Sequence, residues 1–362
     1  MPPGTWNFEV DDISAGVSTN SSNNYSDPDT GSYDNSSYSS YDTTGWVEII
    51  ETVLTGPVVT IGDVDPGGTG IQSSPWNLGS DLVVGNEGHG TLEISAGGKV
   101  MNEYGSIAEN SGAVGEVTVS GIDAHWENSN NLDVGYTGSG SLTIEAQGRV
   151  SNQYGYIGKL SPGDGLVTVT GENARWENEK ILYVGHWANG ALNITNGGRV
   201  TSTGGFISRY STATGVVTVS GADSVWNPQT SLRIAYKGNG SLVIEDGGTV
   251  TNDNNGYIGE GATAVGAVTV RGHGSLWNNS GNLEVGDKGT ATLTIEDGGE
   301  VIVGDTTTIG SDGSVNLTGG RFEFGKMSMA EFSVVHATGG ALAGNVLLAG
   351  VNDASLLTAL QN

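Results

Sequence analysis

The chain has 362 residues, of which 61 are glycine and none is cysteine. It carries 13 Lys and Arg against 40 Asp and Glu, a formal net charge of −27 at pH 7, so nucleic acid and anionic membranes are not expected partners. The lack of cysteine excludes disulfides, a thiol nucleophile and thiolate metal sites. Helix formers are scarce, and Gly, Ser, Thr and Asn surround short Val, Ile and Leu pairs, which indicates many short strands joined by tight turns.

The N-terminal part differs in composition from the rest. Residues 17–44 are nearly all Ser, Asn, Asp, Tyr, Thr and Gly, and such a segment buries too little apolar surface to fold by itself. We predict that residues 1–45 form an N-terminal cap that contains this low-complexity segment. Within it, Asp27, Asp29 and Asp34 are spaced somewhat as in a calcium loop. They are candidate ligands for Ca²⁺, the one cofactor that the sequence suggests, and the alternative is that they are solvated acids.

A repeat begins after this segment. Tryptophans recur every fifty residues, with one extra residue before the last, at Trp76, Trp126, Trp176, Trp226 and Trp277. Each unit divides into two halves, because nine triplets with apolar first and third residues follow one another at steps of about 25, from residues 92–94 to residues 293–295. A tenth triplet stands at residues 315–317, and residues 59–61 are expected to begin the stack.

A step of 25 residues accommodates three short strands and three turns, which is one coil of a parallel β-helix whose coils stack at roughly 4.8 Å. We therefore predict an all-β fold, a right-handed parallel β-helix (β-solenoid) of 10–11 three-strand coils over residues 46–325. Residues 326–362 are expected to be a C-terminal cap or a truncated continuation. A β-propeller with four-stranded blades is the main alternative. The division of each unit into halves favours the solenoid.

Val and Trp alternate from coil to coil at the end of one strand, from Val100 and Trp126 to Val250 and Trp277. We interpret these tryptophans as core, because a large ring beside a small branched side chain fills the interior. Two residues further on, a column of mostly Asn side chains predicts a ladder of hydrogen bonds between coils. Its members are Asn102, Asn128, Asn152, Asn178, Ser202, Pro228, Asn252 and Asn279.

The repeat also resembles a known family. The relevant segments are Leu132–Gly135, Gly138–Ile144, Gly215–Gly221 and Ser224–Trp226. Through this pattern, residues 76–325 resemble the repeat associated with autotransporter passenger regions and with exported bacterial proteins that carry a PEP-CTERM sorting signal. The resemblance implies an extracellular or cell-surface location and a β-helical stalk or passenger. It implies no defined reaction.

The residue before the Val or Trp position is basic in five successive coils, at Lys99, His125, Arg149, Arg175 and Arg199. In register these residues would form one column, which we call the basic stripe. In so acidic a protein it is a candidate binding site for the sulfate or carboxylate groups of a glycan. The alternative is that these cations neutralise nearby acids such as Glu127 and Glu177.

No complete catalytic centre emerges from the sequence. The five histidines are scattered, and the glycine-rich turns belong to the repeat. Parallel β-helices also carry polysaccharide lyases and glycoside hydrolases, so those are the reactions to expect if the chain is an enzyme. Outward Thr residues of the triplets, such as Thr118 and Thr143, could match an ice lattice, but Glu93 and Asn193 interrupt their column and disfavour that function.

We therefore predict an extracellular structural or adhesive passenger-type protein that presents a β-solenoid surface. The expected partners are polysaccharide or another cell-surface protein, with self-association through the solenoid ends as a further interaction. The alternative is a carbohydrate-active lyase, hydrolase or glycan-binding module that uses the basic stripe for an acidic polysaccharide. The sequence shows neither a signal peptide nor an apolar run that could span a membrane, so we expect any export signal to lie outside this chain.

Overall fold

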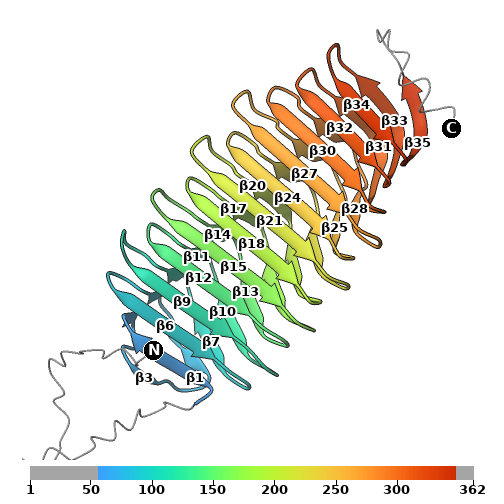
Figure 1. Cartoon of the computed structure of the whole chain (residues 1–362). Coiled ribbons are helices and arrows are strands. Elements are labelled where there is room, and N and C mark those ends of the chain that lie inside the picture. The colour runs from blue at the N-terminus through green and yellow to red at the C-terminus, as the bar shows by residue number, and fades with distance from the viewer. Residues whose placement is uncertain (1–55, 348–362) are drawn as a thin grey trace, which may run out of the picture. The chain divides into compact units, whose positions relative to one another are not determined.

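The computed structural model describes residues 56–347, and within this range strands are the only regular secondary structure. Thirty-five strands, β1 to β35, form the walls of an elongated solenoid (Figure 1). Consecutive coils pair in parallel at an offset of about 25 residues, so that Leu142 lies opposite both Val117 and Val167. This confirms the parallel β-solenoid and rules out the antiparallel blades of a propeller. Residues 56–347 contain no helix with the length and hydropathy of a membrane span.

The strands form three walls. The first wall is a 13-stranded sheet. In spatial order its strands are β3 (Gly70–Ile71), β1 (Val58–Gly62), β6 (His89–Ile94), β9 (Val114–Val119), β12 (Ser139–Ile144), β15 (Asp164–Thr170), β18 (Asn189–Thr195), β21 (Thr214–Ser220), β24 (Asn239–Glu245), β27 (Val265–Arg271), β30 (Thr290–Glu296), β32 (Gly313–Thr318) and β34 (Val334–Thr338).

The second and third walls alternate along the chain. The second wall contains β4 (Trp76–Asn77), β7 (Lys99–Asn102), β10 (His125–Asn128), β13 (Arg149–Asn152), β16 (Arg175–Asn178), β19 (Arg199–Ser202), β22 (Val225–Pro228), β25 (Thr249–Asn252) and β28 (Leu276–Asn279). The third wall contains β2 (Val64–Asp65), β5 (Leu82–Val84), β8 (Gly105–Ile107), β11 (Leu132–Val134), β14 (Gly155–Ile157), β17 (Ile181–Val184), β20 (Gly204–Ile207), β23 (Leu232–Ile234), β26 (Gly256–Ile258) and β29 (Leu283–Val285). Three longer strands run through both walls, namely β31 (Glu300–Ile309), β33 (Arg321–Met329) and β35 (Ala341–Leu347).

The N-terminal end of the first wall corrects one expectation. Residues 59–61 join the stack, but in the reverse direction, because β1 pairs antiparallel with both β6 and β3. The reversed strand covers the edge of β6, whose backbone groups would otherwise be free to pair with another chain. At the other end, parallel pairing continues beyond residue 325, since β34 pairs with β32 and β35 with β33.

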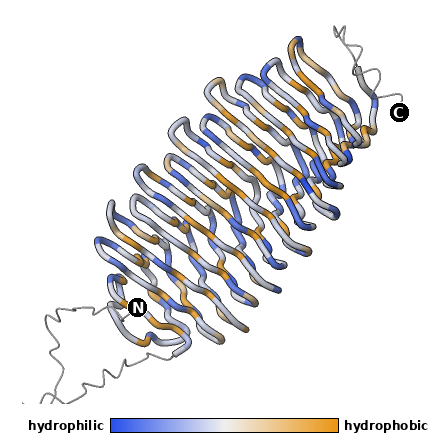
Figure 2. The backbone as a smooth tube through the Cα atoms, viewed as in Figure 1, coloured by the Kyte–Doolittle hydropathy of each residue, from blue (hydrophilic) through white to orange (hydrophobic). Residues whose placement is uncertain are grey.

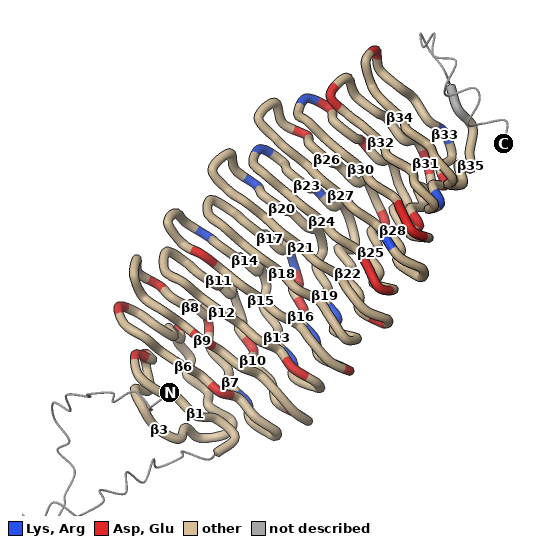
Figure 3. The backbone as a smooth tube through the Cα atoms, in the orientation of Figure 1, with Lys and Arg blue, Asp and Glu red and all other residues tan. Residues whose placement is uncertain are grey.

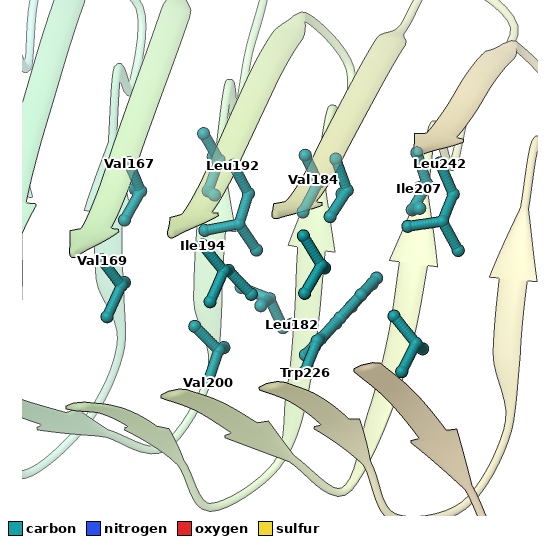
Figure 4. Close-up of a cluster of buried hydrophobic side chains, with 14 of the residues drawn as sticks. Val167, Val169, Leu182, Val184, Leu192, Ile194, Val200, Ile207, Trp226 and Leu242 are labelled. Carbon is teal, nitrogen blue, oxygen red and sulfur yellow. The ribbon is translucent and has the colours of Figure 1, made fainter. Parts of the chain in front are cut away.

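The core lies between the walls. Buried apolar residues alternate with more exposed ones along the strands. Figure 2 shows the apolar residues as orange segments of the strands. Trp126, Trp176, Trp226 and Trp277 are all fully buried, which confirms their interpretation as core. Figure 4 shows Trp226 between the walls near Val200 and Leu182.

Each indole ring needs space in the preceding coil. Coils with Trp in the second wall have leucine at the first inward position of the third wall, such as Leu182 after Trp176. Coils with Val have glycine there, such as Gly155, which pairs with Leu182. A Cβ atom on Gly155 would lie 2.8 Å from Cζ2 of Trp176. The same relation joins Gly205 to Trp226. The alternation of Val and Trp is therefore matched by an alternation of Gly and Leu.

The predicted asparagine ladder exists, and it is organised in pairs of coils. The Oδ1 atom of Asn152 accepts a hydrogen bond from Nε1 of Trp176 at 2.7 Å, while its Nδ2 donates to Oδ1 of Asn178, also at 2.7 Å. The same two bonds occur around Trp126 and Trp277. The column therefore satisfies the indole N–H groups of these three tryptophans and most of its own amides, although Nδ2 of Asn128 is buried without a partner.

The third repeat lacks this arrangement. Ser202 and Pro228 stand where the other repeats have asparagine. The serine does not reach the indole, so both Nε1 of Trp226 and Oγ of Ser202 are buried without a hydrogen-bond partner. An unsatisfied buried donor costs about 1–3 kcal/mol.

We predict that the double substitution Ser202→Asn with Pro228→Asn stabilises the protein by about 1–2 kcal/mol, because Trp226 gains an acceptor and the new amide gains a partner. Urea unfolding followed by tryptophan fluorescence would measure the change. Ser202→Asn alone is the control and should gain less, since its amide N–H would face the side chain of Pro228. A double variant no more stable than the single one would contradict this account.

Candidate functional site

The five residues of the basic stripe lie side by side on the second wall. His125 is paired with Lys99 on one side and Arg149 on the other, and Arg175 lies between Arg149 and Arg199. The structure therefore brings the predicted residues into one column at the start of β7, β10, β13, β16 and β19. Figure 3 shows basic segments along this edge, interleaved with acidic ones.

Part of the stripe is neutralised. Nη2 and Nε of Arg149 lie 2.5 Å and 3.0 Å from Oε2 of Glu177. Nε2 of His125 lies 2.9 Å from Oγ of Ser151. Burial, helped by the charge of Arg149, lowers the pKa of His125 below its usual value, so its ring is neutral at pH 7. Two of the five side chains are thus unavailable as free cations.

The other three members are more open. Lys99, Arg175 and Arg199 are exposed, and within residues 56–347 none of them forms an ion pair. A guanidinium at an exposed edge is free to meet an anion, but it is also well solvated. Glycan binding by the stripe stays a prediction.

A second set of residues, which sequence reasoning missed, lies on the third wall. The outward positions of successive strands carry aromatic or basic side chains over five coils, and strand pairing places them in register. They are Tyr156, Tyr183, Phe206, Arg233 and Tyr257. On one side the preceding two coils carry Asp133 and then Ser106 at this position, and on the other side the next coil carries Glu284. The solenoid backbone therefore does not require aromatic residues here.

The rings stack on one another. The centroids of Tyr156 and Tyr183 are 4.9 Å apart with 14° between the planes, and those of Tyr183 and Phe206 are 5.4 Å apart with 29°. The ring faces meet along the column, and Tyr183 in its middle is only 5% exposed. Burial raises the pKa of Tyr156 to about 12 and also raises that of Tyr183, so both hydroxyls remain hydrogen-bond donors at neutral pH.

The turns after these strands add a second column. At each turn one residue has a left-handed backbone, as at Gly158 with φ 67° and Ser208 with φ 59°, and the side chain that follows it lies beside the stack. The residues that directly follow the left-handed position are Lys159, His186, Arg209, Tyr236 and Glu260. In two coils the next residue also belongs to this column, namely Trp187 and Tyr210. Trp187 and Tyr210 stack at 3.7 Å with 9° between the rings, and Trp187 is 39% exposed.

Two cations of this region are paired with acids. Nζ of Lys159 lies 2.7 Å from Oδ2 of Asp133 and 4.7 Å from the centroid of Tyr156. Nε of Arg233 lies 2.9 Å from Oε2 of Glu260. Each cation therefore has a carboxylate, and Arg233 also lies over the aromatic ring of the next coil.

Arg209 differs from these two. Its guanidinium carbon lies 4.8 Å from the ring centroid of Tyr183, 5.2 Å from that of Phe206 and 5.3 Å from that of Tyr210. Within the described part of the chain it forms no ion pair, and its Nε is buried without a hydrogen-bond partner. Arg209 is held by three rings and by a contact with the Tyr183 hydroxyl, and not by a carboxylate.

His186 lies between the two columns. Its ring meets those of Tyr156, Tyr183 and Tyr210 edge to face at 5.1–5.2 Å. Its Nδ1 lies 3.3 Å from the carbonyl oxygen of Lys159. Burial lowers the pKa of His186 to about 4, and the charges of Arg209 and Lys159 act in the same direction, so the imidazole is neutral at pH 7.

We call this surface the aromatic–cation strip. It consists of Asp133, Tyr156, Lys159, Tyr183, His186, Trp187, Phe206, Arg209, Tyr210, Arg233, Tyr236, Tyr257 and Glu260. A sequence signal for it exists, since the position between the two buried residues of each third-wall strand turns aromatic after Asp133. The turn residues give no comparable signal, because their approach to the wall depends on the turn geometry.

The calcium candidates Asp27, Asp29 and Asp34 lie outside the described residues. Within residues 56–347 the structure shows no group of three or more His, Asp or Glu side chains arranged to hold a metal ion.

Comparison with known proteins identifies no family. No family model matches the chain, and no curated protein matches it. Among solved structures, it is similar to the crystal structure of a hyper-glycosylated TibA fragment, whose glycosylation is catalysed by TibC. The two are 19% identical with a TM-score of 0.33, and the match covers 76% of this chain and 95% of that one. None of the conclusions below depends on this likeness.

The pKa of Asp133 gives a testable pH dependence. Burial raises this pKa to about 6, against the opposing charge of Lys159. Between about pH 4 and pH 6 the unfolded chain loses this proton while the folded protein retains it, so the folded state loses stability as the pH rises. We predict that Asp133→Asn gains stability relative to the wild type over this interval, on the order of 2 kcal/mol.

Urea unfolding at pH 4, 5, 6 and 7 would measure this difference. Asp164→Asn is the matched control, because Asp164 is exposed and its variant should follow the wild-type profile. Parallel profiles for the wild type and Asp133→Asn would show that the buried carboxyl does not titrate as described.

Proposed function

We propose that this chain is an extracellular, adhesive β-solenoid protein that binds carbohydrate through the aromatic–cation strip. The observation that carries this proposal is the restriction of the strip to a few successive coils of the third wall. Neighbouring coils keep the same backbone with Ser106 or Glu284 at the equivalent position. An aromatic patch that the fold does not require is best explained by an interaction with a partner.

The chemistry of the strip suits sugars. Tyr, Trp and His side chains combine an apolar body with a polar group, which matches the hydroxyl groups and C–H faces of a pyranose. Trp187 supplies exposed ring surface, and Tyr210 stacks against it. Coils repeat at roughly 4.8 Å. This spacing supports a polymeric ligand that runs along the solenoid and meets a similar set of groups at each step.

The proposed location outside the cell has separate support. Residues 76–325 resemble the repeats of exported bacterial proteins, and a net charge of −27 suits a protein that must remain soluble among cell-surface polymers. A rigid stack of coils holds its outward side chains at fixed intervals, which suits adhesion.

A carbohydrate-active enzyme is the second candidate. The observation that favours it is Asp133, whose pKa of about 6 would allow it to donate a proton near neutral pH. Its side chain is buried and bound to Lys159, which leaves the carboxyl poorly placed to reach a glycosidic oxygen. The production of reducing ends or unsaturated sugars from an acidic polysaccharide, lost in Asp133→Asn, would favour the enzyme.

Affinity electrophoresis in gels that contain single polysaccharides would test binding. We predict that the wild type is retarded by at least one polymer, and that the double variant Trp187→Ala with Tyr210→Ala binds about tenfold more weakly, since it removes the exposed stacked pair. Arg175→Gln with Arg199→Gln alters only the basic stripe and should bind as the wild type does.

The two variants separate the two surfaces. Loss of binding in the basic-stripe variant alone would move the site to the second wall. If no polysaccharide retards the wild type, the carbohydrate proposal is wrong. Circular dichroism and thermal unfolding would establish that both variants keep the solenoid fold.

A further inference from the structure

We infer that Arg209 is the anion-binding residue of the aromatic–cation strip, and that the ligand is a polysaccharide with spaced carboxylate groups, such as one whose repeat unit has a single uronic acid among neutral sugars. This inference rests on the proposed function and names its ligand class. Three observations support it, namely the charge balance of the strip, the geometry around the guanidinium and the acids that flank the site.

The charge balance singles out Arg209. Lys159 and Arg233 are each within 2.9 Å of a carboxylate oxygen of the protein, whereas Arg209 has no such partner within residues 56–347. Arg175 and Arg199 also lack an ion pair, but both are exposed, whereas Arg209 is half-buried and its Nε is fully buried. A half-buried charge that lacks a counterion is costly, and an incoming carboxylate would recover that cost.

The geometry fits a carboxylate. The rings of Tyr183, Phe206 and Tyr210 lie 4.8–5.3 Å from the guanidinium carbon and hold it in place by cation–π contact. Its Nε–H has no acceptor. Because Nε is buried, a ligand carboxylate would accept from the two Nη groups, whose N–H bonds form a fork that is fixed in advance and loses little entropy on binding.

Uncharged polar and aromatic groups lie beside this charge, and His186 offers a ligand hydroxyl an acceptor nitrogen. His186 is uncharged at pH 7, and its Nδ1 contacts a backbone carbonyl, which leaves Nε2 for a ligand hydroxyl. The exposed indole of Trp187 lies against Tyr210, next to Arg209 in the chain. A sugar carboxylate on Arg209 would therefore place a neighbouring hydroxyl near His186 and the ring carbons of the sugar near the indole of Trp187.

The flanking acids select against densely charged polymers. Asp133 and Glu260 lie at the two ends of the strip and bind its other cations. Nucleic acid or a heavily sulfated glycan would bring negative charge close to these acids and to the strongly acidic chain around them. A polymer with one carboxylate for every few sugar rings can place that group on Arg209 without this repulsion.

The test uses two polymers with the same backbone, namely a polysaccharide with a single uronic acid among the neutral sugars of its repeat unit and the carboxyl-reduced neutral form of that polysaccharide, in binding titrations at fixed ionic strength. We expect the wild type to bind the acidic form about tenfold more tightly than the neutral form. Arg209→Gln should lose this preference and bind both forms with similar affinity. Arg209→Lys keeps the charge but loses the fork, and it should retain only part of the preference.

Arg175→Gln is the matched control, because it removes the same charge from the basic stripe and should keep the full preference. If Arg209→Gln keeps the preference, or Arg175→Gln loses it, the assignment of Arg209 is wrong. Equal binding of both polymers by the wild type would overturn the acidic ligand class and leave the proposed function standing. Binding of neither polymer, together with no other polysaccharide, would refute the proposed function itself. Should Arg209→Gln fail to fold, the Lys variant alone decides the assignment.

Discussion

The fit of each indole ring against the preceding coil is the constraint on which this solenoid depends. The ring of Trp176 needs the small Gly155 beside it and an acceptor for its N–H, which Asn152 supplies. Both residues belong to the previous coil, so neither coil can form this layer of the core alone. The fifty-residue repeat is therefore the smallest unit that packs completely, although each coil has only about 25 residues. The third repeat, with Ser202 and Pro228, retains the shape of this arrangement and loses its hydrogen bonds.

This constraint separates the positions that the fold uses from those it leaves open. Inward positions and the Asn corner are fixed by packing, whereas the outward position of each third-wall strand can carry Ser106, Tyr156 or Glu284 without a change of backbone. Surface chemistry can thus differ from coil to coil on a constant scaffold. The aromatic–cation strip and the basic stripe are two such departures, and they lie on different walls.

The inward columns could be predicted from the sequence because packing repeats at a fixed step, and the basic stripe because it stands one residue before the Trp position. The reversal of β1 could not, since Val59-Thr60-Ile61 has the same pattern of apolar residues in either direction. The aromatic–cation strip could not be predicted from the sequence for a different reason. Its parts come from a strand and from the turn after it, and the position of Arg209 beside Phe206 depends on the left-handed backbone of Ser208.

The reversed strand β1 also makes the two ends of the first wall different, because pairing is antiparallel at the N-terminal end and parallel at the other. In a stack of parallel coils each coil repeats the one before it along a single axis. The strands of the last coil have unpaired N–H and C=O groups, with which a further coil could pair. At the N-terminal end of the first wall this order stops, because β1 pairs antiparallel with β6 and with the two-residue strand β3 on its other side. A further coil from another molecule would meet the short strand β3 in place of a free edge of β1. The parallel part of the first wall therefore begins at β6, because the chain's own strand β1 covers the edge of β6.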